Sequence, residues 1–534
     1  MLIHYRLCYY ILVKDESEEA PPYMEVLFLY TAVQSAIVVG VDGVGIAVEV
    51  DIASGIPQIA VVGLPDSAVR ESVDRVRSAI RNSGFQFPLE RITINLAPAA
   101  LRKEGTTLDL AIAAGLLQAS GQLDYELKQM LLIGELSLDG TVRPIQGVLA
   151  LMQYAKQAGF QKMILPAGNE QEAQLLSGID ICTITHLSEL KELAFQPSET
   201  LQKHIAASHT DTRPELDLTD IVGQQEAKRA LLIAAAGRHN IIVSGPPGVG
   251  KTMLMRRLPT ILPELSELEA IEVMKIYSVA GKLAIHDSNI KRQPPFRAPH
   301  HSISTAGLIG GGSNPKPGEV TLSHHGVLFL DELPEFSRQV LELLRQPLEE
   351  HAVTISRARH HITFPASFLL AASCNPCPCG FHGFATEQAS CTCTHQMIQR
   401  YRSKLSGPLL DRIDIQLDIG RPMSLVQSSV DLAYSSHELK AKVLQAISIQ
   451  QERYRSEAFS YNSELPSSAL KRYAPLPKEA TTMLEHAFNK LGLSMRGYNR
   501  IIKIARTIAD IDGNEHIELP HIAEAVQYRK LDLY

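Results

Sequence analysis

Residues 241–252 read Ile241-Ile-Val-Ser-Gly-Pro-Pro-Gly-Val-Gly-Lys-Thr252, an apolar strand followed by the pattern G-x-x-x-x-G-K-T. In such a P-loop the backbone N–H groups point at phosphate oxygens, the lysine reaches the β- and γ-phosphates, and the threonine hydroxyl ligates Mg²⁺. Because a strand precedes the motif and a helix follows it, a chance glycine-rich turn is the weaker interpretation. The predicted nucleotide-binding residues are Gly245, Pro246, Pro247, Gly248, Val249, Gly250, Lys251 and Thr252.

Length and charge limit the classes of protein to consider. A chain of 534 residues is long enough for three or four domains. Its hydrophobic fraction of 45% and charged fraction of 20% are typical of a soluble globular protein. The formal net charge of -7 excludes a globally basic nucleic-acid binder. Any contact with DNA or RNA must therefore depend on local basic elements.

Two apolar stretches near the N-terminus could be mistaken for targeting signals. Residues 7–13 lack a small-residue cleavage site, and residues 26–41 are too short for the roughly 20 residues that span a bilayer. We expect no membrane segment, a non-structural leader over residues 1–23, and a folded chain that begins near Met24. The seven cysteines form no even disulfide framework, which favours a cytoplasmic location.

The first predicted domain covers residues 24–195. Apolar residues alternate with other residues over 46–52 and 92–96, which is the period of half-buried strands. Between them, apolar residues recur at helical spacing over 69–80, with Asp66 as the expected N-cap. Further expected elements are a helix over 108–117, a hairpin over 134–147, a helix over 148–158 and a strand over 163–165. The sequence predicts an α/β domain.

This region resembles the proteolytic domain of Lon proteases, a ribosomal S5-like α+β fold that uses a Ser-Lys dyad. The resemblance rests on Lys103-Glu-Gly, on the Gly134-Glu hairpin and on Pro144-Ile-Gln-Gly147. Thr107 and Leu149 stand where the resemblance places the serine and the lysine. A leucine cannot deprotonate a hydroxyl, so nucleophilic catalysis by this route has no mechanism. We expect a Lon-like domain without protease activity.

A polar connector over residues 196–216 is expected to lead into the ATPase core, residues 217–425. Within the core, Gly326-Val-Leu-Phe-Leu-Asp-Glu332 reads as a buried strand that ends in two acids. Asp331 is expected to hold the Mg²⁺ shell, and Glu332 to orient or deprotonate the attacking water. A third strand, Phe368-Leu-Leu-Ala-Ala-Ser-Cys-Asn375, ends in an asparagine suited to sense the γ-phosphate.

Three further features resemble AAA+ ATPases. Leu409-Leu-Asp-Arg-Ile-Asp414 resembles the arginine-finger segment, in which Arg412 would reach the γ-phosphate of a neighbouring subunit. Ser494-Met-Arg-Gly-Tyr-Asn-Arg500 resembles the sensor-2 segment of a helical lid, with Arg496 in the sensor position, and the lid is expected over residues 426–534. Two short strands, 351–355 and 361–364, resemble the hairpin that precedes sensor 1 in the group with magnesium chelatase, MCM helicases and RuvB-like motors.

The chain from about residue 24 onward resembles the ComM/YifB family of magnesium-chelatase-like AAA+ proteins. Besides the acid pair, the resemblance rests on residues 62–71, Pro295-Phe-Arg-Ala-Pro-His-His301, residues 310–312 and Cys374-Asn-Pro-Cys-Pro-Cys-Gly380. It implies a hexameric ATPase that uses ATP and Mg²⁺ and, for the ComM members, a DNA branch-migration helicase that acts in DNA uptake or recombination. The expected DNA contacts are Arg357 and Arg359 at the hairpin tip, and Lys291, Arg292 and Arg297; solvated hairpin ends are the alternative.

Cysteines are concentrated in one segment. Cys377 and Cys379 make one C-x-C pair, and Cys391 and Cys393 make another. Four thiolates from two close pairs can complete a tetrahedral structural Zn²⁺ site. A set of reduced, partly buried cysteines is the other interpretation, because the usual zinc pair is C-x-x-C. Both remain open from the sequence.

The competing functions come from different classes. A DNA motor needs ATP, a ring and local basic elements. A magnesium-chelatase-like regulatory or remodelling ATPase would have no DNA substrate, and a Lon-type protease is disfavoured by Leu149. Stimulation of the ATPase by DNA would separate the first two.

Overall fold

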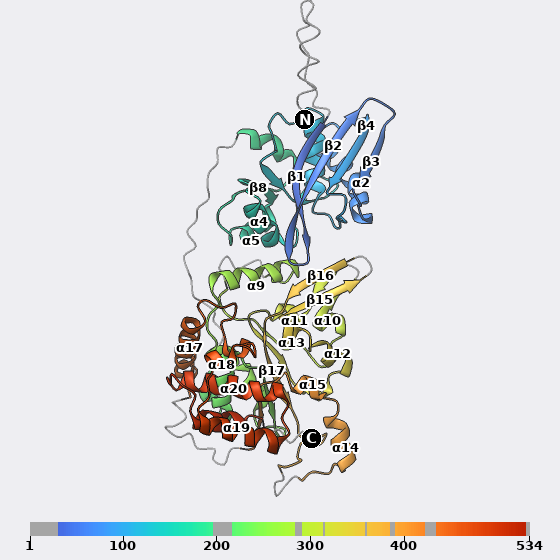
Figure 1. Cartoon of the computed structure of the whole chain (residues 1–534). Helices are drawn as coiled ribbons and strands as arrows, with labels where there is room; N and C mark the ends of the chain where they lie inside the picture. The colour runs from blue at the N-terminus through green and yellow to red at the C-terminus, as the bar shows by residue number, and fades with distance from the viewer. Residues whose placement is uncertain are drawn as a thin grey trace, which may run out of the picture.

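The computed structural model describes most of the chain, in residues 30–195, 216–283, 291–312, 315–357, 360–384, 390–421 and 434–529. The expected leader and nearly all of the expected connector lie outside these residues. An N-terminal domain, a nucleotide-binding core and a set of C-terminal helices are visible in Figure 1, with α9 (Glu267–Val279) between the N-terminal domain and the core. No helix in the described residues combines the length and the apolar character needed to cross a membrane.

A seven-stranded mixed sheet forms the centre of the N-terminal domain. Its order is β3 (Gln58–Val62), β4 (Arg91–Ala97), β2 (Asp42–Ala53), β1 (Tyr30–Val39), β5 (Met130–Leu132), β8 (Lys162–Pro166) and β9 (Asp180–Ile184). β2 pairs antiparallel with β1 and β4, and the other pairs are parallel. In β2 the alternating Ile46, Val48, Val50 and Ile52 are buried, as the period of two predicts. β1 comes from the apolar run that is too short to span a bilayer.

Helix α2 (Ser67–Asn82) confirms the helical spacing expected after Asp66. The Asp66 side chain accepts a hydrogen bond from the Val69 backbone N–H at 2.8 Å, which satisfies a donor at the helix start. Val73, Val76 and Ile80 are buried with Val69. The other elements of the domain are α3 (Asp109–Ala119), the hairpin β6 (Glu135–Leu136) and β7 (Val142–Arg143), α4 (Val148–Gln157) and α5 (Glu170–Ala173). The α/β prediction is confirmed.

The core contains a five-stranded parallel sheet. Its order is β11 (Phe296–Arg297), β14 (Val327–Leu330), β17 (Leu369–Cys374), β10 (Ile241–Ser244) and β18 (Ile415–Asp418). β10, β14 and β17 are buried along their whole length, which explains their continuous apolar sequences. Because the strands are parallel, the P-loop, the acid pair and Asn375 all follow the carboxyl edge of one sheet.

Shorter elements surround this sheet. They are α6 (Gln225–Gly237), α7 (Lys251–Arg256), α8 (Leu258–Ile261), α10 (Thr305–Ile309), β12 (Gly310–Gly311), β13 (Lys316–Pro317), α11 (Glu319–Leu322), α12 (Arg338–Leu343), α13 (Pro347–Glu350), β15 (Ala352–Arg357), β16 (His360–Pro365), α14 (His395–Arg402) and α15 (Gly407–Leu410). After the acid pair, α12 ends at Leu343, and Pro347 begins a separate helix, α13. β15 and β16 form the expected antiparallel hairpin.

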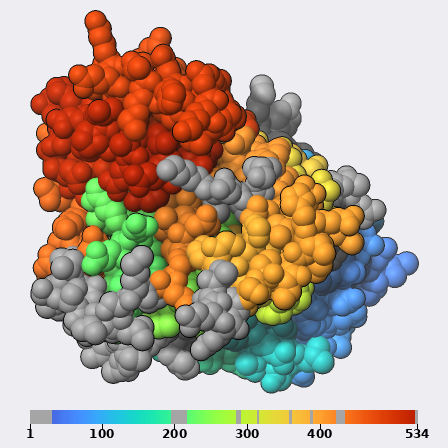
Figure 2. All heavy atoms as spheres, turned by 90° about the horizontal axis from the view of Figure 1, so that it is seen from below, coloured from blue at the N-terminus to red at the C-terminus, as the bar shows by residue number. Residues whose placement is uncertain are grey.

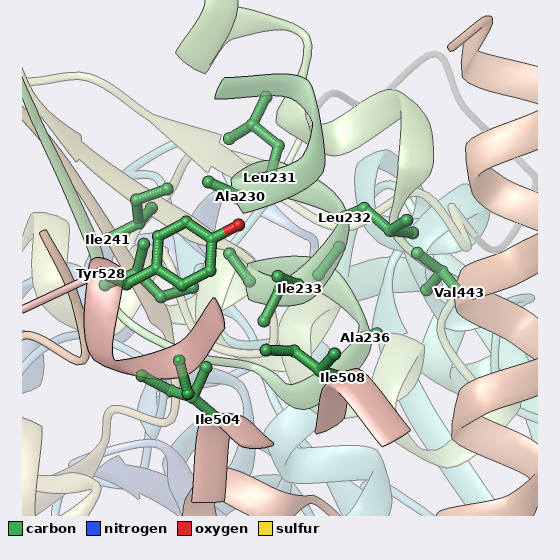
Figure 3. Packing of buried hydrophobic residues seen from close by; sticks show 14 of the residues in the cluster. Ala230, Leu231, Leu232, Ile233, Ala236, Ile241, Val443, Ile504, Ile508 and Tyr528 are labelled. Carbon is green, nitrogen blue, oxygen red and sulfur yellow. The ribbon is translucent and has the colours of Figure 1, made fainter. Parts of the chain in front are cut away.

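The C-terminal part is helical, as expected for a lid. It comprises α17 (Ser436–Arg453), α18 (Leu470–Tyr473), α19 (Lys478–Leu491), α20 (Met495–Ile511) and α21 (Leu519–Gln527). Leu232 of α6 lies beside Val443 of α17, and Ala236 of α6 lies beside Ile508 of α20 (Figure 3). A fully buried leucine, valine or isoleucine side chain contributes about 1.5–3 kcal/mol. From below, these red helices form one lobe beside the orange segment around α14 (Figure 2).

Helix α9 joins the N-terminal domain to the core. Lys275 Nζ lies 2.8 Å from Asp42 Oδ1, and Ser278 Oγ donates to the half-buried Glu172 carboxylate. Met274 enters a hydrophobic cluster of the N-terminal domain. The two regions are therefore packed against each other through α9.

Candidate nucleotide-binding and catalytic site

The P-loop connects β10 to α7 at the carboxyl edge of the core sheet. Gly248 and Gly250 have φ angles of +80° and +91°, in the left-handed region that glycine enters without steric cost. A Cβ on Gly245 would lie 2.3 Å from the Ile419 carbonyl oxygen, so this position admits no side chain. The predicted nucleotide-binding residues from Gly245 to Thr252 form one continuous loop at the start of a helix.

Lys251 folds back over this loop. Its Nζ donates to the carbonyl oxygens of Gly245 at 2.7 Å and Pro246 at 2.9 Å, and to Asn375 Oδ1 at 3.0 Å. Burial lowers the pKa of this amine, while nearby acidic groups oppose the shift. The structure thus brings together the lysine and the asparagine that the sequence assigns to the γ-phosphate. A phosphate at this point would give the ammonium group an anionic partner in place of neutral carbonyls.

The acid pair lies beside the first turn of α7. Thr252 Oγ1 donates to Asp331 Oδ2 at 2.8 Å. Glu332 has an exposed side chain and a left-handed backbone with φ of +53°. Its N–H donates to Asp331 Oδ1 at 3.1 Å and to Ser373 Oγ at 3.3 Å. Such backbone strain occurs where neighbouring contacts fix a functional residue.

Two oxygen donors in this group fit Mg²⁺. The Thr252 hydroxyl and the Asp331 carboxylate are adjacent, and Mg²⁺ is commonly held by a carboxylate, a hydroxyl, phosphates and water. When bound, the ion would neutralise charge on the β- and γ-phosphates.

Ser373 is a further residue of this site that none of the sequence motifs identifies. Its side chain is fully buried and donates a hydrogen bond to Asp331 Oδ1, while it accepts one from the Glu332 N–H. It therefore connects the two acids to the sensor strand. One signal was available, because Ser373 is a polar residue within the otherwise apolar strand that ends at Asn375.

Arg412 lies at the opposite edge of the sheet from the P-loop of its own chain. It precedes β18, which runs parallel to β10, and the N–H groups of Asp414 and Ile415 both donate to the Asn240 carbonyl just before β10. A strand of four residues spans about 13 Å. The Arg412 side chain is only 5% exposed; its guanidinium group donates to the Pro408 carbonyl at 2.6 Å and pairs with Glu349 at 2.7 Å.

Arg496 meets Arg412 at this edge. It lies in the first turn of α20, is 58% exposed, and places Nη2 3.0 Å from Glu349 Oε1, the same oxygen that Arg412 contacts. The hydrogen bond from Arg412 and the charges of both arginines lower the pKa of the Glu349 carboxyl. Glu349 itself was not singled out from the sequence, where it is one acid among several on a short helix.

The expected DNA-binding residues fall into three groups. The Arg357 side chain and Arg359 lie outside the described residues, although β15 and β16 that carry the hairpin tip are described. Arg292 and Lys291 are exposed. Arg297 is half-buried and pairs with Glu319 at 2.5 and 2.8 Å, which raises its pKa. Arg297 therefore already has an acidic partner in Glu319.

The four predicted zinc ligands converge. Cys377 Sγ lies 3.3 Å from Cys379 Sγ and 3.8 Å from Cys391 Sγ, and the latter two are 3.6 Å apart. Cys393 joins them, with all four sulfurs within 4.8 Å of one another. A tetrahedral Zn²⁺ with Zn–S bonds of about 2.3 Å places its sulfurs about 3.8 Å apart. Hydrogen bonds from backbone N–H groups, of which that of Phe381 has the largest effect, lower the pKa of the Cys379 thiol to about 6.

The Lon-like domain holds no base at the expected position. The Leu149 side chain is buried in a hydrophobic cluster, and its backbone N–H donates to Glu172 Oε1 at 3.2 Å. Glu172 also accepts from Ser278 of α9. The helix that would carry the lysine therefore takes part in contact with the core.

Family models match most of the chain. Residues 217–425 match the model described as magnesium chelatase, subunit ChlI; residues 48–169 match subunit ChlI of Mg-chelatase; and residues 433–529 match the ChlI C-terminal model. These matches fall on the nucleotide-binding core, the N-terminal domain and the C-terminal helices.

Curated relatives extend over nearly the whole chain. The competence protein ComM of Haemophilus influenzae is 44% identical over 504 residues, which cover 92% of this chain and 96% of that protein. The uncharacterized protein YifB of Escherichia coli is 42% identical, with 92% and 96% covered. Lon protease 2 of Bacillus subtilis is 31% identical over 142 residues, 26% of this chain and 25% of that protein. With its P-loop, acid pair and lid in place, the chain belongs to the ComM/YifB family of magnesium-chelatase-like AAA+ ATPases.

Proposed function

We propose that this protein is a ring-forming ATPase in which each active site is shared by two adjacent copies. The observation that carries the proposal is the position of Arg412. The phosphate-binding residues lie at the carboxyl edge of the sheet, whereas Arg412 and Arg496 lie at the amino edge. Neither arginine can serve the P-loop of its own chain across that distance. A second copy, presenting its amino edge, would supply both; the family resemblance favours six copies.

The residues of such a site divide the work of hydrolysis. Lys251 and the P-loop N–H groups bind the phosphates, and Thr252 and Asp331 hold Mg²⁺. Glu332 orients the water, because its exposed carboxylate projects from the strand end beside Asp331. Asn375 contacts the γ-phosphate through the position it now shares with Lys251. Arg412 of the neighbouring copy stabilises charge as the γ-phosphoryl group leaves, a role worth about 10³–10⁵ in rate in other systems.

Subunit mixing tests the shared site. Arg412→Ala and Lys251→Ala should each hydrolyse ATP poorly alone. Mixed, they should partly recover activity, because an intact P-loop then faces an intact Arg412 at some interfaces. The matched control mixes Lys251→Ala with Glu332→Gln, which damages the same side of the site twice and should recover nothing. Absence of recovery in the first mixture at every ratio would refute the proposal, provided that an affinity tag on one variant co-purifies the other and so shows mixed assembly.

We further propose that ATP hydrolysis drives movement along DNA, as a branch-migration translocase. The family resemblance supports this, and so does the hairpin β15–β16, which ends close to the sensor strand β17. Local basic groups at the hairpin tip, with Lys291 and Arg292, would contact phosphates, since the net charge is -7. DNA should raise ATP turnover, and branched DNA should be unwound. If DNA leaves turnover unchanged, a regulatory or remodelling ATPase is the better description.

The four cysteines carry a proposal of their own, a structural Zn²⁺. The sulfur spacings of 3.3–3.8 Å match a tetrahedral thiolate site, whereas free thiols have no reason to gather in this way. Elemental analysis of anaerobically purified protein should find about one zinc per chain. Protein without stoichiometric zinc would refute this part alone.

A further inference from the structure

The cysteine cluster, defined as Cys377, Cys379, Cys391 and Cys393, lies beside the P-loop. Cys377 follows the sensor residue Asn375 by two positions, and the turn closes with the Gly380 N–H donating to the Cys377 carbonyl at 3.0 Å. Gly380 has a φ of +86°. A Cβ on it would lie 2.6 Å from Pro247 Cδ. The turn that carries the first cysteine pair therefore touches the phosphate-binding loop at Gly380 and Pro247, with no room for a side chain.

A second contact lies just after the end of β18. Phe384, just beyond the first cysteine pair, packs over Gly420, with its ring 3.7 Å from the position of a Cβ there. The Gly420 carbonyl accepts from Gln224 Nε2 at 2.7 Å, and the neighbouring Ile419 carbonyl approaches Gly245. The segment that begins with Cys377 thus borders the loop at Pro247 and reaches the strand end that borders it at Gly245.

Two parts of this segment, called its arms below, contact each other. One arm continues from β17, and the other leads into α14, whose Arg402 Nε donates to the Pro376 carbonyl at 3.4 Å. Between the arms, thiol contacts are weak, and thiolates at these spacings repel one another. A divalent ion neutralises that charge and crosslinks the arms.

We propose that zinc in the cysteine cluster holds the P-loop in its binding conformation, so that the affinity for nucleotide depends on the metal. This inference rests on the zinc site proposed above. With zinc bound, Gly380 is held against Pro247, and Asn375 is held beside Lys251. Without it, the arms separate and the loop loses a rigid wall. The cysteine cluster then positions the residues of the nucleotide site and is not itself a catalytic group.

The test measures zinc content and nucleotide affinity on the same full-length protein. Zinc is removed with 1,10-phenanthroline, the chelator is removed, and a fluorescent ADP analogue is titrated with Mg²⁺ present. Affinity should fall by about tenfold or more and return when one equivalent of Zn²⁺ is added. Binding replaces hydrolysis as the readout, so the result does not depend on ring assembly or on DNA.

Two variants separate the coupling from the metal. Gly380→Ala keeps all four thiols but pushes a Cβ into Pro247, so zinc should remain while nucleotide affinity falls. Cys182→Ser removes a half-buried thiol in β9, outside the cysteine cluster, and should change neither the zinc content nor the nucleotide affinity. Unchanged affinity in zinc-free protein and in Gly380→Ala, with zinc present in the wild type, would overturn the coupling and leave the zinc site standing. Absence of zinc in the wild type would overturn both.

Discussion

Replacing Ser373 by alanine tests how the acid pair is held. Ser373 is fully buried, and its Oγ donates to Asp331 while accepting from the Glu332 N–H at 3.3 Å. The substitution removes one oxygen atom and leaves almost no cavity. It therefore perturbs the orientation of both acids without disturbing the packing of β17.

The expected size follows from these contacts. A hydrogen bond to a charged group contributes about 1.5–3 kcal/mol, and each 1.36 kcal/mol corresponds to about tenfold in rate. Glu332 keeps a second acceptor, Asp331 Oδ1 at 3.1 Å, so the loss should lie near the lower end. We expect kcat to fall by about 10- to 30-fold in Ser373→Ala.

The assay is ATP turnover at saturating nucleotide over a range of Mg²⁺ concentrations. Half-saturation should move to higher Mg²⁺, because Asp331 loses a donor that orients it toward the ion. Nucleotide affinity in the absence of Mg²⁺ should not change. The matched control is Ser323→Ala, a buried serine away from this edge whose Oγ donates to the Val320 carbonyl at 2.7 Å. If Ser373→Ala stays within about twofold of wild type in kcat and in Mg²⁺ half-saturation, Ser373 does not orient the acid pair.

Three further predictions concern other parts of the chain. Glu332→Gln should still bind ATP while turnover drops by about 10²-fold or more; equal turnover would remove Glu332 from its role. The double variant Arg357→Ala, Arg359→Ala should keep its basal ATPase activity but lose the stimulation by DNA. The slope of DNA affinity against salt concentration should fall by about one unit per lost phosphate contact. An unchanged slope would mean that other residues bind the DNA. Burial raises the pKa of Asp109 to about 6 despite the ion pair with Arg75, so its contribution to stability is present below pH 4 and is lost as pH rises through 6. Hydrogen exchange of α3 in wild type and Asp109→Asn should therefore diverge over that range, and parallel pH profiles would contradict it.

Much of the fold follows from local sequence. Strand periods, the Asp66 cap and the continuous apolar strands of the core each depend on residues close together in the chain, and the structure confirms them. The apolar run that contains β1 is too short to span a membrane, but it shows no regular period of two, so the sequence does not identify it as a strand. β3 and β9 are short and only partly buried, so they carry too weak a period to identify.

The candidate site was predictable as a set of motifs but not as a geometry. Lys251 and Asn375 were each identified, yet their contact depends on the order of strands in the sheet. Glu349 could not be identified, because it acts only through Arg412 and Arg496, which are distant in sequence. The C-x-C spacing left zinc open, and only the convergence of the two pairs favours a metal.

The position of Arg412 depends on both the sheet and the lid. Its backbone carbonyl accepts from Asn240 Nδ2 at 3.1 Å and from Arg500 Nη1 of α20 at 2.9 Å. Asn240 Oδ1 in turn accepts from the Leu370 N–H of β17. Since Asn240 directly precedes β10, the P-loop of a chain and its own Arg412 are joined by a single four-residue strand and one side-chain amide. A displacement of β10 when nucleotide binds would therefore reach Arg412 and, in the ring proposed above, the site of the next copy.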